Sequence, residues 1–262
     1  RTVCYCACSC GSNRGIGDCP ERVQILQNNK PSGYPSIERL KKLAVQIETY
    51  VPWITLLCVL APIGGSLLSV IMGRRGPKGV IALAAMAVSI GAAFYVFAHV
   101  WEHEALHLRI RWFSIDDHAF YIGLLLDNMA VLMMALVCAI AFAVHVYSVA
   151  YMKGDPGIHR YWVYLGLFCS AMLGLVVADN LLMLYICWEL VGVASYLLIG
   201  FWFTRDAAAQ ANKKAFLINR IGDISFLIGI ALVYTGFGTL DVTELTDPES
   251  RHTFGLNDSW LI

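Results

Sequence analysis

Residues 181–203, LLMLYICWELVGVASYLLIGFWF, form an apolar segment with one charged residue, Glu189, near its middle. The next apolar segment, 213–234, carries Arg220 and Asp223 near its middle. Each segment is long enough for a helix that crosses a bilayer, which takes roughly 20 residues. A charged side chain at the bilayer centre costs at least about 2.5–3.5 kcal/mol on insertion scales. Because two successive segments bear this cost, we predict a path for protons or ions through a helix bundle.

The composition indicates an all-α integral membrane protein. Of the 262 residues, 58% are hydrophobic and 15% are charged, and the mean hydropathy is +0.62. Soluble domains have about 45–50% apolar and about 25% charged residues. The apolar residues also occur in long blocks, which favours a lipid bilayer as the surroundings. The net charge is zero and no basic patch is visible, so we expect no binding of nucleic acid.

Six apolar segments predict six transmembrane helices, because each is near the length needed to span a bilayer. The predicted spans are 51–72, 80–101, 128–152, 161–178, 181–203 and 213–234. Between the second and third spans, apolar and polar residues alternate in two runs around Asp116-Asp117. This period of two predicts a short β-hairpin on the outer surface.

Loop charges predict the orientation of the spans. The loops after the first, third and fifth spans are basic, and the opposite loops are acidic. The basic residues are Arg74, Arg75, Lys78, Lys153, Arg160 and Arg205, and the acidic ones are Glu102, Glu104, Asp116, Asp117, Asp241, Glu244, Asp247 and Glu249. Arg109, Arg111 and Arg251 are the main cations on the acidic side. The positive-inside rule places the basic side in the cytoplasm or matrix.

The N-terminal residues 1–50 are predicted to form a separate, polar, Cys-rich extension ahead of the membrane part, 51–262. Residues 1–35 have the composition of a disordered segment, and 36–50 that of a short amphipathic interfacial helix. Five of the nine cysteines lie here, in a C-x-C pattern that is not the spacing of a zinc or ferredoxin site. A misplaced gene start is the alternative to a disordered extension. Arg1 begins the chain and a new apolar run ends it, so both ends look cut.

The other four cysteines lie singly in the apolar spans, and we expect them to be small buried hydrophobic residues. They are Cys58, Cys138, Cys169 and Cys187.

The charged residues of the fifth and sixth spans are predicted to lie near the bilayer centre. At 1.5 Å per residue, Glu189 is roughly 12 Å from the outer surface and Asp223 roughly 15 Å from the inner one. Arg220 and Asp223 are spaced i, i+3 and can pair on one helix face. An unpartnered Glu189 would then take up a proton readily, because desolvation disfavours the anion. We predict a proton relay of these three residues; a static buried network that joins two helices is the alternative.

Four further residues in or near the spans have more than one interpretation. Lys213 and Lys214 begin the sixth span, either as snorkelling interface anchors or as proton-uptake residues. His145 and His99 are expected to be hydrogen-bonded core residues or members of a water chain, although two histidines on separate helices could ligate a haem. Lys214 and His145 are therefore possible members of the proton path.

Three local features are given structural interpretations. Asp127-Asn128 and Asp179-Asn180 stand where the third and fifth spans begin, which is typical of helix N-caps. Trp188 is expected to pack. The chain contains no G-x-G-x-x-G, P-loop, C-x-x-C or nucleophile elbow, which excludes soluble redox chemistry and ATP hydrolysis from it.

Three stretches closely resemble the antiporter-like membrane subunits of respiratory complex I, and most of all the distal one, called L in bacteria and 5 in mitochondria. They are 178–201, ADNLLMLYICWELVGVASYLLIGF; 214–223, KAFLINRIGD; and 145–156, HVYSVAYMKGDP. The LLLD run that ends at Asp127 fits as well. The resemblance covers 51–262, and its Trp-Glu and Asn-Arg-Ile-Gly-Asp motifs are specific to this superfamily.

The resemblance implies the first six helices of a proton-translocating subunit of NADH:quinone oxidoreductase, in which quinone reduction elsewhere drives proton movement. Glu189 matches the family's essential glutamate, whose partner is a lysine on a seventh helix, and Arg220 and Asp223 match residues that polarise this pair. No cofactor is implied in this chain, since FMN, iron–sulfur clusters and quinone belong to other subunits. The implied partners are the other membrane subunits of complex I, in a bacterial inner membrane or alternatively a mitochondrial one.

The chain also departs from the family. Family members have over a dozen helices, and Leu190 stands where many have glycine. Two other functions stay open: the large subunit of a multi-subunit sodium/proton antiporter, which has the same half-channel, and a haem-binding electron-transfer protein that uses His99 and His145.

Overall fold

The computed structural model describes residues 37–72, 79–101, 105–115 and 118–246. The chain divides into the units Arg1–Val45 and Gln46–Ile262, and the second is described here by itself. The predicted disordered extension and its five cysteines lie outside the described residues. Several charged loop residues lie outside them too: Arg74, Arg75, Lys78, Glu102, Glu104, Asp116, Asp117, Asp247, Glu249 and Arg251.

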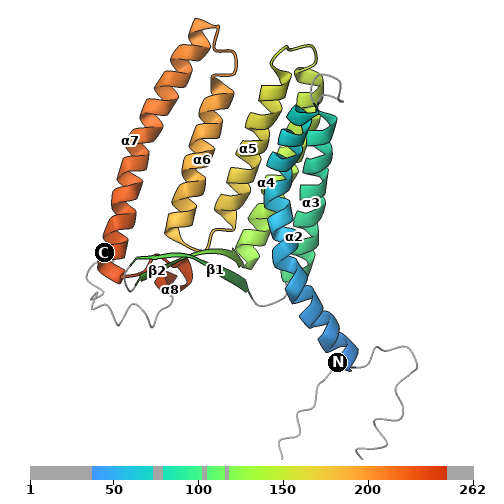
Figure 1. Ribbon diagram of the computed structural model, residues 1–262, viewed down its shortest axis with the longest axis vertical. Coiled ribbons are helices and arrows are strands. Elements are labelled where there is room, and N and C mark those ends of the chain that lie inside the picture. The colour runs from blue at the N-terminus through green and yellow to red at the C-terminus, as the bar shows by residue number, and fades with distance from the viewer. Residues whose placement is uncertain (1–36, 73–78, 102–104, 116–117, 247–262) are drawn as a thin grey trace, which may run out of the picture. The chain divides into compact units, whose positions relative to one another are not determined.

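The described part of the chain is mostly helical, with one two-stranded sheet (Figure 1). The long helices are α2 (Ile37–Ile71), α3 (Val80–Val100), α4 (Asn128–Tyr151), α5 (Ile158–Val176), α6 (Leu181–Ile199) and α7 (Asp206–Phe237). The strands are β1 (Leu106–Ile115) and β2 (His118–Leu126), and the short helix α8 (Val242–Thr246) follows α7. The predicted fold class, a helical membrane protein with a short hairpin, is confirmed.

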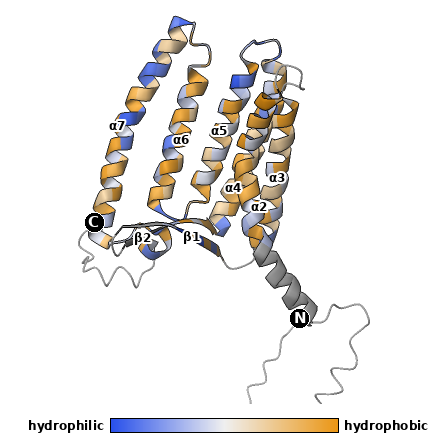
Figure 2. Cartoon of the chain, in the orientation of Figure 1, coloured by the Kyte–Doolittle hydropathy of each residue, from blue (hydrophilic) through white to orange (hydrophobic). Residues whose placement is uncertain are grey.

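Five helices in the described ranges are long and apolar enough to cross a membrane: Tyr50–Ile71 of α2, and the whole of α3, α4, α6 and α7. The predicted span 161–178 does form a helix, α5, but this helix is not among the five. His159 and Arg160 lie in its first turn, which makes α5 more polar than its neighbours. Figure 2 shows hydrophobic colouring along the helices, interrupted by hydrophilic segments midway along α6 and α7.

Two predicted helix boundaries differ from those in the structure. Helix α2 is continuous from Ile37, so the predicted interfacial segment and the first predicted span form one helix. Helix α7 begins at Asp206, because 206–212, DAAAQAN, is rich in alanine, the best helix former. Lys213 and Lys214 therefore lie inside α7 rather than at its start.

Two predicted helix caps are present. The side chain of Asp127 accepts a hydrogen bond from Ala130 N at 2.7 Å, and that of Asn180 accepts one from Met183 N at 2.7 Å. Each cap satisfies a backbone N–H that has no partner within the helix. These contacts begin α4 and α6 at the predicted places.

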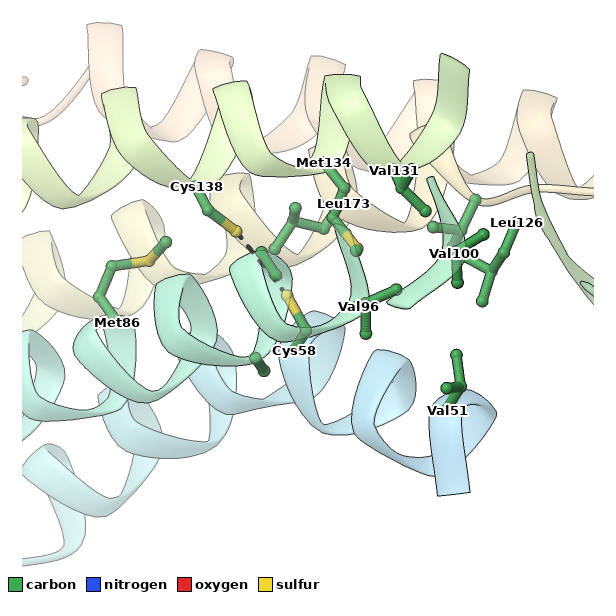
Figure 3. Close-up of a cluster of buried hydrophobic side chains, with 13 residues drawn as sticks. Val51, Cys58, Met86, Val96, Val100, Leu126, Val131, Met134, Cys138 and Leu173 are labelled. Atoms are coloured by element: carbon green, nitrogen blue, oxygen red, sulfur yellow. Dashed lines mark hydrogen bonds between the residues drawn. The ribbon is translucent and has the colours of Figure 1, made fainter. Parts of the chain in front are cut away.

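The core lies between α2, α3, α4 and α5 (Figure 3). Its largest cluster of buried side chains includes Val51, Cys58, Met86, Val96, Val100, Leu126, Val131, Met134, Cys138 and Leu173. Cys58 Sγ and Cys138 Sγ are 3.7 Å apart within it. All four cysteines of the spans are buried, as predicted.

The predicted β-hairpin is present at the end of the helices where α3 ends and α4 begins, here called the hairpin end. Strands β1 and β2 are antiparallel, with Leu106 opposite Leu126 and Arg109 opposite Gly123. Leu125 N donates a hydrogen bond to Val177 O at 3.0 Å, which joins β2 to the connection between α5 and α6. The hairpin is therefore attached to the start of α6.

We expect Gly123→Ala to destabilise this attachment. A Cβ at Gly123 would overlap the carboxylate of Asp179 and lie 2.7 Å from Leu108 O. Relief of such overpacking typically costs about 1–3 kcal/mol, so the melting temperature of the full-length protein in detergent should fall. The matched control is Gly91→Ala in α3, where nothing lies within 4 Å of the added Cβ. Equal melting temperatures for the two variants would contradict the steric argument.

Candidate functional site

Helices α6 and α7 lie side by side (Figure 1), and aromatic contacts join them. The ring centroids of Tyr185 and Phe226 are 5.7 Å apart, and those of Tyr196 and Phe216 are 5.2 Å apart. Residue numbers rise along α6 as they fall along α7, so the two helices are antiparallel. This arrangement places the middle of α6, with Glu189, opposite the middle of α7, with Arg220.

Arg220 contacts both carboxylates that the sequence singled out. Its Nη1 donates a hydrogen bond to Glu189 Oε2 and lies 3.6 Å from Asp223 Oδ2. The side chains of Arg220, Glu189 and Asp223 are 31%, 21% and 9% exposed. One guanidinium thus serves two carboxylates, and the cluster has a net charge of −1 when all three groups are ionised. The three predicted residues do come together.

The pairing within this cluster differs from the expectation. The predicted pair of Arg220 with Asp223 is present, but Glu189 is not unpartnered, because the shorter contact of Arg220 is with Glu189. The i, i+3 spacing permits a pair within α7, and the neighbouring helix offers a second carboxylate that the spacing does not reveal. Arg220 also stacks over Phe216, with Cζ 4.9 Å from the ring centroid, which holds the guanidinium against α7.

Trp188 does more than pack. Its indole Nε1 donates a hydrogen bond to Asp223 Oδ1 at 3.0 Å, so Asp223 is held from α6 as well as by Arg220. The adjacent residues Trp188 and Glu189 therefore engage Asp223 and Arg220 respectively. The sequence signal for this role is the Trp-Glu dipeptide in an apolar span, since a buried indole N–H usually finds a hydrogen-bond partner.

A cavity of about 650 Å³ borders the cluster on the side of Asp223. It is lined by Leu175, Leu184, Trp188, Val191, Gly192, Ser195, Ile218, Asn219, Gly222, Asp223 and Phe226, from α5, α6 and α7. Glu189 is not among the lining residues. Asp223, Ser195 and Asn219 give this mostly apolar cavity a few polar groups, the kind of site that holds hydrogen-bonded water.

Lys214 and His145, the possible path members, are apart from this cluster. Lys214 is exposed on α7 and has no ion pair with any residue that the structure describes. His145 is buried in α4, where Nδ1 lies 2.8 Å from Ala141 O and the ring packs against Trp162. Neither lines the cavity beside Asp223. Their roles in a proton path stay predictions.

The two histidines of the haem interpretation lie towards opposite ends of the helices. His99 is in the last turn of α3, at the hairpin end. His145 is far along α4, which starts at that same end with Asn128, so it is about 25 Å further on at 1.5 Å per residue. Haem ligands must both reach one iron, and this separation does not allow it. The structure therefore gives no support to the haem interpretation.

Two family models match the chain. Residues 178–260 match the transmembrane family described as NADH:quinone oxidoreductase/Mrp antiporter, and residues 112–162 match the N-terminus of chain 5 of NADH-ubiquinone oxidoreductase, complex I. The first match includes Glu189, Arg220 and Asp223, and the second includes β2 and α4.

Curated relatives agree with these matches. The chain is 43% identical over 157 residues to NAD(P)H-quinone oxidoreductase chain 5 of Synechocystis, an alignment that covers 58% of this chain and 23% of the relative. It is 36% identical over 205 residues to NADH-quinone oxidoreductase subunit L of Mycobacterium tuberculosis, covering 76% of this chain and 32% of that protein. The chain thus spans between about a quarter and a third of these relatives.

A solved structure shares the fold. The membrane-bound sulfane sulfur reductase, an archaeal respiratory membrane complex, contains a chain that superposes with a TM-score of 0.64 at 18% identity. The superposition covers 77% of this chain and 41% of the other.

Proposed function

We propose that the full-length protein translocates protons as subunit 5, or L, of an NADH:quinone oxidoreductase, because residues 112–162 and 178–260 match family models of such membrane subunits and the curated relatives carry these names. In this proposal Glu189 accepts the proton, and Arg220 and Asp223 modulate it. The observation that carries the proposal is the position of Arg220 between two carboxylates in the middle of neighbouring membrane-length helices.

The geometry supports a switch in which the guanidinium moves between two partners. With Arg220 at Glu189, the carboxylate of Glu189 is stabilised. When Arg220 shifts towards Asp223, Glu189 loses its cation, and protonation then lowers the cost of keeping it in apolar surroundings. A unit charge about 4 Å away is worth roughly 4 kcal/mol at an effective dielectric constant of about 20.

The partners and the cofactors follow from the same proposal. The relatives are subunits of quinone oxidoreductases, so we infer that other membrane subunits of complex I contact this chain. FMN, iron–sulfur clusters and quinone would be bound by other subunits, and the chain's own residues would only move protons. We infer a bacterial inner membrane, with a mitochondrial inner membrane as the alternative.

The test is ion movement by the assembled complex in proteoliposomes. We expect NADH-driven quinone reduction to acidify one side of the membrane, as read by a pH-sensitive dye, with the same initial rate in sodium and potassium salts. Sodium-dependent proton movement that needs no quinone reduction would instead identify a sodium/proton antiporter and would overturn the proposal.

We expect Asp223→Asn to reduce translocation roughly two- to tenfold. This loss is smaller than the one expected for Glu189→Gln, because Asp223 modulates the cluster without being its first proton acceptor. Trp188→Phe removes the indole hydrogen bond to Asp223 but keeps an aromatic ring beside Phe226, and it should have a smaller effect in the same direction. The measurement is the initial pumping rate divided by the quinone reductase rate. A variant Asp223→Asn that prevents assembly would favour the static network over the relay.

A further inference from the structure

A second charged cluster lies at the hairpin end, where side chains of the hairpin meet the connections that flank α6 and α7. Arg109 in β1 places Nε 3.3 Å from Asp179 Oδ2 and Nη1 3.1 Å from Asp241 Oδ2. Its Nη2 donates a hydrogen bond to Thr243 Oγ1 at 3.0 Å. His107 Nε2 lies 3.1 Å from Asp179 Oδ2. One strand thus contacts two connections that are distant in sequence.

The two carboxylates belong to the helices that carry the candidate relay. Asp179 comes directly before Asn180, the N-cap of α6, and Asp241 follows Gly238, the C-cap of α7. Backbone hydrogen bonds join the same segments: Leu181 N donates to Leu240 O and Val242 N donates to Asp179 O, both at 3.0 Å. The hairpin end of α6 is therefore fastened to the hairpin end of α7.

The cluster needs its guanidinium for electrostatic reasons. The side chain of Asp179 is fully buried and that of Asp241 is 16% exposed. Among the residues that the structure describes, Arg109 is the one lysine or arginine that reaches either of them. Without it, two poorly solvated carboxylates would repel each other across the α6–α7 junction, with His107 left beside Asp179 alone.

We propose that Arg109 is a positioning residue: by neutralising the repulsion between Asp179 and Asp241, it keeps the hairpin ends of α6 and α7 at the separation at which Arg220 reaches Glu189. A helix transmits a displacement of its end along its length, and Glu189 is only about 12 Å along α6 from Leu181 at 1.5 Å per residue. This inference rests on the proposed function, because its main readout is proton translocation.

The test variant is Arg109→Gln in the full-length subunit of the assembled complex. We expect translocation per quinone reduced to fall roughly tenfold, since a misplacement of reacting groups by about 1 Å can cost about 10²-fold and a smaller one costs less. The matched control is Arg111→Gln, two residues further along β1. Arg111 is exposed and has no ion pair in the described part of the chain, so its variant should translocate normally.

The dependence on pH separates positioning from a general loss of structure. Burial raises the pKa of Asp241; Arg109 opposes this rise, Glu244 and Asp179 add to it, and His107 also opposes it. Without Arg109 the pKa of Asp241 rises further, so Asp241 is protonated at a higher pH. Protonation removes the repulsion with Asp179, and the defect of Arg109→Gln should therefore shrink as the pH on the hairpin side is lowered.

The deciding variant is Arg109→Gln/Asp241→Asn, which removes the repulsion without any protonation of Asp241 or His107. We expect it to restore translocation at every pH, and to restore assembly if Arg109→Gln alone does not assemble. Normal translocation by Arg109→Gln, or a double variant as defective as the single one, would overturn the positioning role.

Glu189→Gln in the same preparation keeps the two proposals apart. If Glu189→Gln loses translocation while Arg109→Gln keeps it, only the positioning role fails. If Glu189→Gln keeps translocation, the relay fails and the role of Arg109 fails with it.

Discussion

Replacing Glu189 with glutamine in the full-length protein is expected to reduce proton translocation at least about tenfold while the complex still assembles. Glutamine has nearly the shape of glutamate and can still accept a hydrogen bond from Arg220, but it cannot take up a proton. Loss of a positioned acid or base commonly costs 10²- to 10⁴-fold in proton transfer, and other proton-pumping subunits would limit the visible loss. The measurement is the initial pumping rate per quinone reduced, with assembly followed on native gels.

Asp206→Asn is the matched control for this variant. Asp206 is an exposed carboxylate in the first turn of α7, far along the helix from Arg220. Its amide variant removes the same charge and should pump normally. Normal pumping by Glu189→Gln itself would eliminate the relay, because the relay requires Glu189 as its proton acceptor.

The second large effect is expected for Arg220→Gln. This change leaves Glu189 and Asp223 without a cation among the residues that the structure describes. Breaking a buried ion pair by removing one partner typically costs about 3–5 kcal/mol; partial exposure of these side chains places the expected loss at the lower end. The melting temperature of the full-length protein in detergent should fall, and pumping should fall with it.

A double variant separates the two consequences of losing Arg220. In Arg220→Gln/Glu189→Gln no uncompensated charge remains at Glu189, whereas Asp223 still lacks a cation, so we expect the melting temperature to recover part of its loss. Pumping should not recover, because the proton acceptor is missing. Recovery of both would favour a static network whose only role is to join α6 and α7. Arg220→Lys keeps the charge but lacks the planar group that reaches two carboxylates, and it should be intermediate in both measurements.

Much of the fold could be predicted from local sequence. Spans of about 20 apolar residues predict membrane helices directly, because the bilayer imposes one length on all of them. The alternation around Asp116-Asp117 predicted the hairpin, and the polar residues at 127 and 180 predicted the starts of α4 and α6. The start of α7 at Asp206 was missed, because helix-forming residues extend this helix ahead of the apolar segment and its N-cap residue, Arg205, makes no side-chain cap hydrogen bond. The continuity of the predicted helix 36–50 with the first span was missed as well.

The sequence by itself also determined which side chains form the candidate relay, since a charge inside an apolar span is visible without a structure. Only the tertiary structure decided how they pair. Arg220 takes Glu189 as its nearer partner, Trp188 donates to Asp223, and Asp179 binds Arg109 on a distant strand. The physical reason is that spacing along one helix predicts only neighbours on that helix. The packing of α6 on α7, and of the hairpin on both, sets which charges meet between elements.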